Sequence, residues 1–147
     1  MKIIIKSRLQ AFRDSYDNCN EKTAIISINT PGCPENTFCA SKNLVRVLPL
    51  FFHDIGVRDR TGVPMGESDA VKIAEFVEWC KDNEVEELWV HCDAGISRSS
   101  GVAAAILKYL TGDDSAIFNS PKYYPNMICY RLTLTALLNG AKKGKEK

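Results

Sequence analysis

The 147-residue sequence lacks several features that define large classes of proteins. Its formal net charge is only +1, so no excess of one sign favours nucleic acid or a membrane surface as a partner. The opening MKIIIKSRLQ has three isoleucines in succession. That run is shorter than the roughly 7 to 15 apolar residues of a secretory core and the roughly 20 of a membrane span. We therefore expect a cytoplasmic globular protein that binds neither membranes nor nucleic acid.

The sequence is also poor in the residue patterns that bind metals. It has two histidines, and its six cysteines form no C-x-x-C pair, so we expect no metal site and no zinc. Without an export signal, the cysteines are expected to be free thiols rather than disulfides. They stand at Cys19, Cys33, Cys39, Cys80, Cys92 and Cys129. Any chemical role for one of them must be inferred from its neighbours.

Strand-like and helix-like segments alternate along the chain, which is typical of an α/β domain. Strands are predicted at 3–6, 23–29, 45–55 and 87–91, and helices at about 7–17, 68–82, 99–110 and 126–138. Pro49 indicates either an edge position for the segment 45–55 or a bulge in its middle, because proline cannot donate to a neighbouring strand. We predict a single domain, 1–147, with a central, mostly parallel sheet of four to five strands flanked by helices. Its ends, 1–6 and 141–147, are expected to fray.

Residue types that commonly begin or end helices predict the helix boundaries. Ser68 is a predicted N-cap for the helix that follows it, and Asn126, after Pro125, is expected to start the last helix. Gly112 and Gly140 are predicted to end the two helices that precede them.

The stretch HCDAGISRSS, residues 91–100, lies between a predicted strand and a predicted helix. Ligands of open α/β sheets bind at this position, outside the carboxyl ends of the strands. A helix start offers unpaired backbone N–H groups and the positive end of the peptide dipole, so the loop 93–98 suits an anion. Gly95 gives the backbone freedom to turn these N–H groups inward.

The side chains of this stretch add a nucleophile and a cation to the anion site. In the positive field of the helix start, Cys92 is expected to be a thiolate at neutral pH and therefore nucleophilic. Arg98 stays charged, and its planar guanidinium binds two oxygens of a phosphate at once. The hydroxyl of Ser99 can hydrogen-bond the Cys92 sulfur and help it to leave in a second step. Together they predict a site that attacks a bound phosphate ester.

These residues reproduce the signature H-C-x5-R-S/T, and the chain resembles the protein tyrosine phosphatase superfamily, in particular its small dual-specificity-like microbial members. The resemblance extends more weakly over about residues 45–138. It implies the fold of these enzymes, a cysteinyl-phosphate intermediate and no cofactor. It implies a nucleophile at Cys92, a supporting role for His91, an assisting hydroxyl at Ser99, and a phosphate-binding loop made by Asp93, Ala94, Gly95, Ile96, Ser97 and Arg98.

Members of this superfamily carry an aspartate upstream of the cysteine as the general acid, and two aspartates are candidates here. Asp54 lies at the end of the predicted strand 45–55, whereas Asp59 lies in the charged segment GVRDRTG. We favour Asp54 because a strand holds a side chain more reproducibly than a loop. His53 is expected to point to the opposite side of the strand.

The variable positions of the loop bear on the substrate. Relatives that hydrolyse phosphoinositides tend to carry lysines there, whereas this loop carries the carboxylate of Asp93. A phosphorylated protein or peptide, with phosphotyrosine as the hydrolysed residue, is therefore the predicted substrate. A dual-specificity enzyme or a phosphatase of non-protein monoesters is an alternative. A catalytically silent phosphotyrosine-binding module is an alternative of another class, and the oligomeric state is left open.

Overall fold

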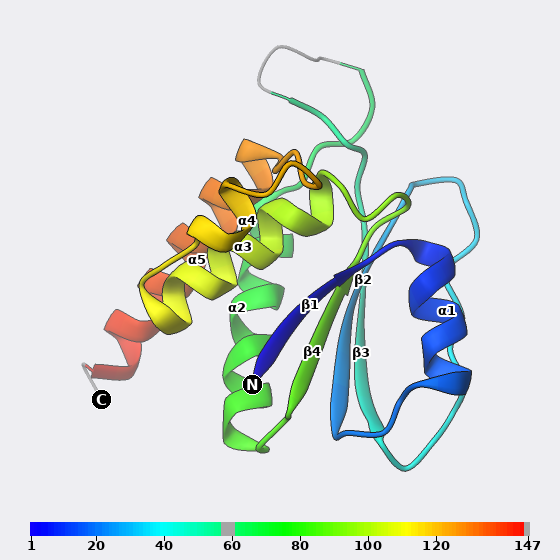
Figure 1. Ribbon diagram of the computed structural model, residues 1–147. Helices are drawn as coiled ribbons and strands as arrows, with labels where there is room; N and C mark the ends of the chain where they lie inside the picture. The colour runs from blue at the N-terminus through cyan, green and yellow to red at the C-terminus, as the bar shows by residue number, and fades with distance from the viewer. Residues whose placement is uncertain (57–60, 146–147) are drawn as a thin grey trace.

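The computed structural model describes residues 1–56 and 61–145, and in it helices cover both faces of a parallel sheet (Figure 1). The four strands pair in the order β1-β4-β2-β3, and every pairing is parallel. The strands are β1 (Lys2–Lys6), β2 (Thr23–Asn29), β3 (Leu44–Phe51) and β4 (Glu87–His91). The predicted α/β fold with a central parallel sheet is confirmed.

The helices are divided unequally between the two faces of the sheet. They are α1 (Arg8–Asp17), α2 (Glu67–Asp82), α3 (Arg98–Thr111), α4 (Ser115–Phe118) and α5 (Met127–Lys145). Helix α1 covers one face, and the other four helices lie on the opposite side (Figure 1). No helix in the described ranges is long and apolar enough to span a bilayer.

The interior strand β2 shows why this sequence forms a sheet covered on both sides. All seven residues of TAIISIN are buried, and the apolar ones are alanine or β-branched isoleucine. A strand of a parallel sheet covered on both faces has such a nearly continuous apolar run. Its polar exceptions near the carboxyl end, Ser27 and Asn29, belong to the site described below. Pro49 lies in the edge strand β3, as predicted.

Close packing brings the start of α5 against the first turns of α3. Ala103, Ala104 and Ala105 are fully buried. A Cβ atom at Gly101 would clash with the carbonyl oxygen of Asn126, so only glycine permits this approach of the two segments. Gly112 ends α3 in a left-handed conformation with φ of 81°, as predicted.

Several predicted boundaries are wrong. Helix α2 begins at Glu67 after Gly66, whose N–H donates to the carboxylate of Asp69, so Ser68 is not the N-cap. Helix α5 continues through Gly140, because a single glycine inside a helix costs only about 1 kcal/mol. The segment 45–55 leaves the sheet after Phe51, and α4 was not predicted.

Both segments that were expected to fray, 1–6 and 141–147, include residues in regular structure. Residues 2–6 form β1, because their backbone pairs with β4 along the whole strand. At the other end, α5 extends to Lys145.

Because all the strands are parallel, the segments that follow them begin together at the carboxyl ends of the strands. Lys6 and Ser27 are each in register with His91, and Asn29 is in register with Phe51. The chain that follows each strand therefore begins at the same edge. A backbone hydrogen bond of 3.0 Å from Arg8 N to the carbonyl of Asp93 joins two of these segments.

Candidate active site

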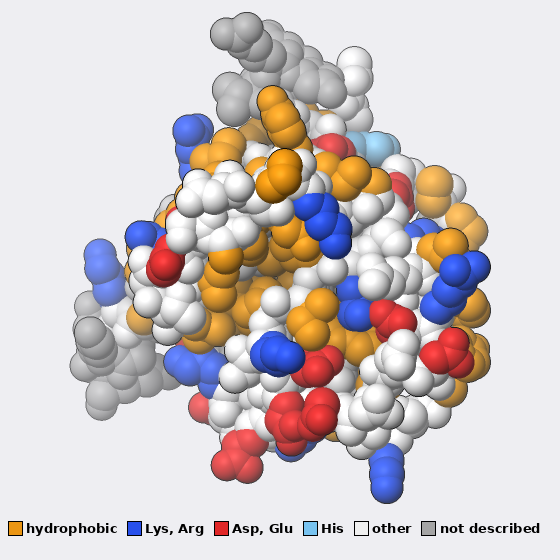
Figure 2. Space-filling view, viewed as in Figure 1, with side chains coloured by type: hydrophobic (Ala, Val, Ile, Leu, Met, Phe, Trp, Pro, Cys, Tyr) orange, Lys and Arg blue, Asp and Glu red, His pale blue; other side chains and the backbone are white. Residues whose placement is uncertain are grey.

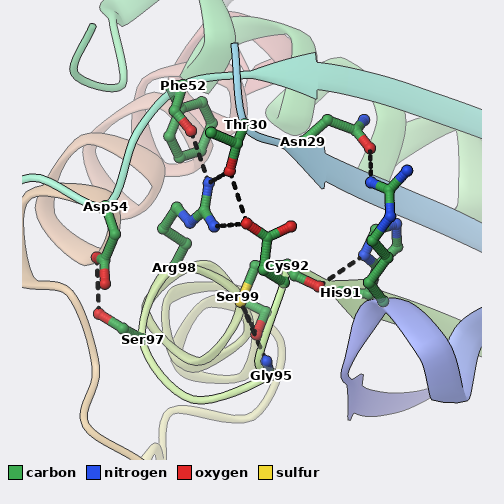
Figure 3. A network of polar contacts seen from close by, with 12 residues as sticks. Asn29, Thr30, Phe52, Asp54, His91, Cys92, Gly95, Ser97, Arg98 and Ser99 are labelled. Carbon is green, nitrogen blue, oxygen red and sulfur yellow. Dashed lines mark hydrogen bonds and ion pairs between the residues drawn. The ribbon is translucent and has the colours of Figure 1, made fainter. Parts of the chain in front are cut away.

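The loop between β4 and α3 closes around a sulfur atom. Gly95 has φ of 72°, and its N–H donates to Cys92 Sγ at 3.3 Å (Figure 3). A Cβ atom at Gly95 would lie 2.7 Å from the backbone nitrogen of Ser7 and 2.8 Å from the carbonyl oxygen of Lys6. The junction of β1 and α1 therefore packs directly against the loop, and glycine is required on both steric and conformational grounds.

The carbonyl groups of the loop are bound by surrounding segments. The carbonyl of Ile96 accepts from Tyr124 N at 2.9 Å, and that of Ser97 accepts from Asn126 N at 2.9 Å. By contrast, the backbone N–H groups of Ala94, Ile96 and Ser97 have no acceptor within residues 1–56 and 61–145. A loop whose carbonyls are turned outward and whose N–H groups are unpaired can bind an anion.

Cys92 lies at the base of this loop with only 3% of its surface exposed. Besides the Gly95 N–H, the hydroxyl of Ser99 lies 3.1 Å from its sulfur. Both groups come from the residues that follow the strand, so the sulfur lies close to the positive end of the helix that begins at Arg98.

Arg98 is buried and oriented by three acceptors (Figure 3). Its Nη1 donates to the carbonyl of Phe52 at 2.8 Å and to Oγ1 of Thr30 at 3.2 Å, and its Nη2 donates to Oδ2 of Asp93 at 3.0 Å. A guanidinium has five N–H donors, so Nε–H and one Nη2–H remain. These two lie on one edge of the group, which is the edge that binds two phosphate oxygens.

Asp93 and Thr30 form the support of that guanidinium. The hydroxyl of Thr30 donates to Oδ2 of Asp93 at 2.6 Å. Burial raises the pKa of Asp93, but the hydrogen bonds from Thr30 and Arg98 and the charge of Arg98 outweigh burial, so the pKa lies below its ordinary value. Thr30 was not predicted. Its only sequence signal is that it is polar and directly follows a buried strand.

His91 is fully buried beneath the loop and joins it to the sheet. Its Nδ1 lies 3.0 Å from the carbonyl of Cys92, and its Nε2 lies 2.6 Å from the hydroxyl of Ser27. Nδ1 therefore donates to the carbonyl, and Nε2 accepts from the hydroxyl. Asn29 continues the network through a hydrogen bond of 3.3 Å from its Nδ2 to the Ser27 hydroxyl. This network places the His91 ring between the loop and the carboxyl end of β2.

His91 is expected to make the protein less stable in mild acid. Burial lowers its pKa from an ordinary value of 6.5 to about 4, so as pH falls the unfolded chain binds the proton first. Stability is thus lost from about pH 6.5 downward, and the loss amounts to about 2 kcal/mol between pH 7.5 and pH 5. Urea unfolding of the wild type and of His91→Gln at both pH values measures this loss of the free energy of unfolding. Equal losses in the two proteins would contradict this assignment.

The favoured acid, Asp54, lies beside the loop. Its Oδ1 accepts from the hydroxyl of Ser97 at 2.8 Å and from Nδ2 of Asn126 at 2.8 Å. Asp54 follows β3 rather than ending it, so these contacts, and not the strand, hold the carboxyl group. His53 takes a different direction and accepts from Val63 N through Nδ1 at 2.8 Å. The alternative acid, Asp59, lies outside the described residues.

Asn126 ties the acid to the loop and to α5. Its Oδ1 accepts from the backbone N–H groups of Ile128 and Cys129 at 3.0 and 3.1 Å, as an N-cap does. Its Nδ2 binds both Asp54 and the carbonyl of Ile55. Asn126 was predicted to start a helix, but its contact with the acid was not predicted, because the two residues lie far apart in sequence.

Solved structures of known proteins share this fold. The chain has the fold of the tyrosine and dual-specificity phosphatases, so the fold that the resemblance implies is confirmed. A human tyrosine phosphatase-like serine/threonine/tyrosine-interacting protein aligns at 19% identity over 95% of this chain and 91% of its own, with a TM-score of 0.63. Human DUSP28 aligns at 14% identity over 96% and 94%, with a TM-score of 0.62.

A further match is a protein solved in complex with a ligand. PTPMT1 in complex with PI(5)P aligns at 16% identity over 97% of this chain and 94% of its own, with a TM-score of 0.57. No protein-family model and no curated protein sequence matches the chain. At these identities the solved structures establish the fold, and the site geometry must carry the argument about function.

Proposed function

We propose that this chain is a cysteine-dependent phosphatase that hydrolyses phosphate monoesters, with phosphotyrosine in a protein or peptide as its preferred substrate. The observation that carries the proposal is the position of Cys92 Sγ. It accepts from the Gly95 N–H and lies 3.1 Å from the Ser99 hydroxyl, in a loop that also carries unpaired backbone N–H groups and the Arg98 guanidinium. A nucleophile and the groups that bind its target therefore meet in one place.

In the first chemical step, the Cys92 thiolate attacks phosphorus while the loop N–H groups and Arg98 hold the non-bridging oxygens. The bond between phosphorus and the ester oxygen breaks. Asp54 donates its proton to that oxygen, so the alcohol departs neutral. Because Oδ1 of Asp54 is held by Ser97 and Asn126, Oδ2 is the oxygen left to carry the proton.

In the second step, water attacks the cysteinyl-phosphate. Ionised Asp54 takes a proton from the water, and inorganic phosphate leaves as the phosphorus–sulfur bond breaks. The hydroxyl of Ser99, 3.1 Å from Cys92 Sγ, stabilises the departing thiolate with a hydrogen bond. The cycle returns Cys92 as a thiolate and Asp54 as an acid.

The charge of the loop supports a substrate with a single phosphate group. Asp93 is paired with Arg98, so its carboxylate offsets much of the positive charge that the guanidinium would present. The loop also contains no lysine. The electrostatic attraction of a polyphosphorylated compound, such as a phosphoinositide, to this loop is therefore weaker than its attraction to a loop rich in lysine. A phosphotyrosine carries only the group that the loop binds.

A phosphoprotein-binding module without catalysis is the second candidate. It is favoured by the likeness to the human protein described as tyrosine phosphatase-like and interacting. Against it, Cys92, Arg98 and Asp54 all remain and lie around one loop. A module that only binds phosphate needs Arg98 and the backbone N–H groups of the loop, but it needs neither a nucleophilic sulfur nor a general acid.

Hydrolysis of matched phosphopeptides tests the proposal. We expect kcat/KM for a phosphotyrosine peptide to exceed that for the same peptide with phosphoserine by about 10-fold or more, and the rates to be unchanged by EDTA. The longer tyrosine ester reaches a buried sulfur more easily, and a tenfold ratio needs only about 1.4 kcal/mol. Phosphate release is the measurement. Tight binding of the peptide without any release of phosphate would instead identify a phosphoprotein-binding module.

A further inference from the structure

Helix α1 carries an exposed apolar stripe that the catalytic proposal does not use. Leu9, Phe12, Arg13 and Tyr16 recur at helical spacing and therefore lie on one face. Leu9 is 55% exposed, Phe12 36% and Tyr16 59%, and the rings of Phe12 and Tyr16 lie 5.2 Å apart. On the right-hand side of the molecule, where α1 lies, hydrophobic side chains stand among basic and acidic ones (Figure 2). We call these four residues the α1 stripe.

The α1 stripe begins at the phosphate-binding loop. A hollow of about 440 Å³ is lined by Arg8, Leu9, Phe12, Asn36 and Asp93. Asp93 directly follows Cys92 and contacts Arg98, so one wall of the hollow belongs to the candidate active site. A chain leaving that site on this side passes over Leu9 and Phe12.

The charged side chains around the α1 stripe are Arg8, Arg13, Asp14 and the exposed Asp17. Arg8 donates to Oδ1 of Asn29 at 3.1 Å and to the carbonyl of Pro34 at 2.6 Å, so it is engaged by the protein itself. Asp14 is paired with Lys6. Arg13 is exposed and forms no ion pair with any residue that the structure describes. An acidic group therefore complements this face.

We propose that the α1 stripe is a docking surface for the polypeptide segment that flanks the phosphorylated residue of a substrate. Apolar side chains of that segment pack on Leu9 and Phe12, and an acidic side chain pairs with Arg13. From Leu9 to Tyr16 the helix rises about 10 Å, which equals about three residues of extended chain. The proposal rests on the proposed function and narrows its substrate to polypeptides with apolar and acidic residues beside the phosphorylated one.

Comparison of a peptide with a small substrate tests the docking surface. In Leu9→Ser/Phe12→Ser, kcat/KM for a phosphotyrosine peptide flanked by leucine and glutamate is expected to fall about 10-fold, because two apolar contacts are lost. Turnover of p-nitrophenyl phosphate, which is too small to reach α1, is expected to change less than about 2-fold. Val71→Ser/Leu138→Ser is the matched control, because both residues are 49% exposed and lie on α2 and α5. It should change neither rate.

A charge reversal keeps the test independent of apolar side chains. Arg13→Glu alters one exposed side chain, and it is expected to lower kcat/KM for the glutamate peptide and to raise it for the same peptide with lysine. An unchanged peptide preference in both variants, with normal turnover of p-nitrophenyl phosphate, would overturn the docking surface alone. Absence of p-nitrophenyl phosphate turnover in the wild type would overturn the proposed function.

Discussion

Cys92→Ser is expected to lower turnover of p-nitrophenyl phosphate by about 10⁴-fold or more, to the limit of detection. The hydroxyl of serine stays protonated at neutral pH, and a serine nucleophile needs a general base beside it. The Gly95 N–H donates to the sulfur and the Ser99 hydroxyl lies 3.1 Å from it, and neither group is a base. Neither of these two groups can therefore activate a serine hydroxyl by taking its proton.

The same variant is expected to keep its affinity for an oxyanion. The loop N–H groups and the free edge of Arg98 are unchanged, so vanadate or a phosphopeptide should still bind. Isothermal titration of Cys92→Ser measures this retention. A variant that retains turnover would show that the reaction takes place elsewhere or with another nucleophile.

Ser99→Ala is the contrasting control, because it keeps the nucleophile and removes the hydroxyl 3.1 Å from it. Attack on phosphorus proceeds, whereas departure of the sulfur in the second step slows. Phosphate bound to the protein should then accumulate as a burst when the reaction is stopped in acid. The two variants together separate formation of the intermediate from its breakdown.

The signature loop was predictable because its chemistry is local. Cys92, Gly95, Arg98 and Ser99 lie within eight positions of one another, and the strand before them and the helix after them are visible as apolar patterns. A strand followed by a helix fixes the direction of the N–H groups without any distant contact. Sequence alone therefore placed the sulfur, the guanidinium and the hydroxyl together.

The supports of the loop were not predictable, because they depend on strand register and helix packing. Thr30 reaches Arg98 only since β2 and β4 pair with Ser27 opposite His91. Asn126 reaches Asp54 only since α5 packs closely against Gly101 of α3. Neither contact produces a pattern that can be recognised in the sequence. The error at the end of the segment 45–55 has the same origin, because Asp54 and Ile55 bind Ser97 and Asn126 rather than a neighbouring strand.

The second large effect is expected for Asp54→Asn, which should lower kcat for a phosphotyrosine peptide by about 10² to 10³-fold. An amide occupies the same place and still binds near Ser97 and Asn126, but it has no proton to give. The fall in rate at high pH that is expected of a reaction with a general acid should disappear in the variant. The loss should be smaller for p-nitrophenyl phosphate, because p-nitrophenolate leaves without protonation more readily than the phenolate of tyrosine.

Asp59→Asn separates the two candidate acids, and Asn126→Ala separates the acid from its support. Asp59→Asn is expected to leave both the rate and the pH profile unchanged. Asn126→Ala removes one of the two donors to Oδ1 of Asp54, so kcat should fall for the peptide while the decline at high pH persists. A profile that loses its high-pH decline in Asp59→Asn but keeps it in Asp54→Asn would transfer the acid to Asp59. The contacts of Asp54 with Ser97 and Asn126 would then serve only to hold the loop against α5.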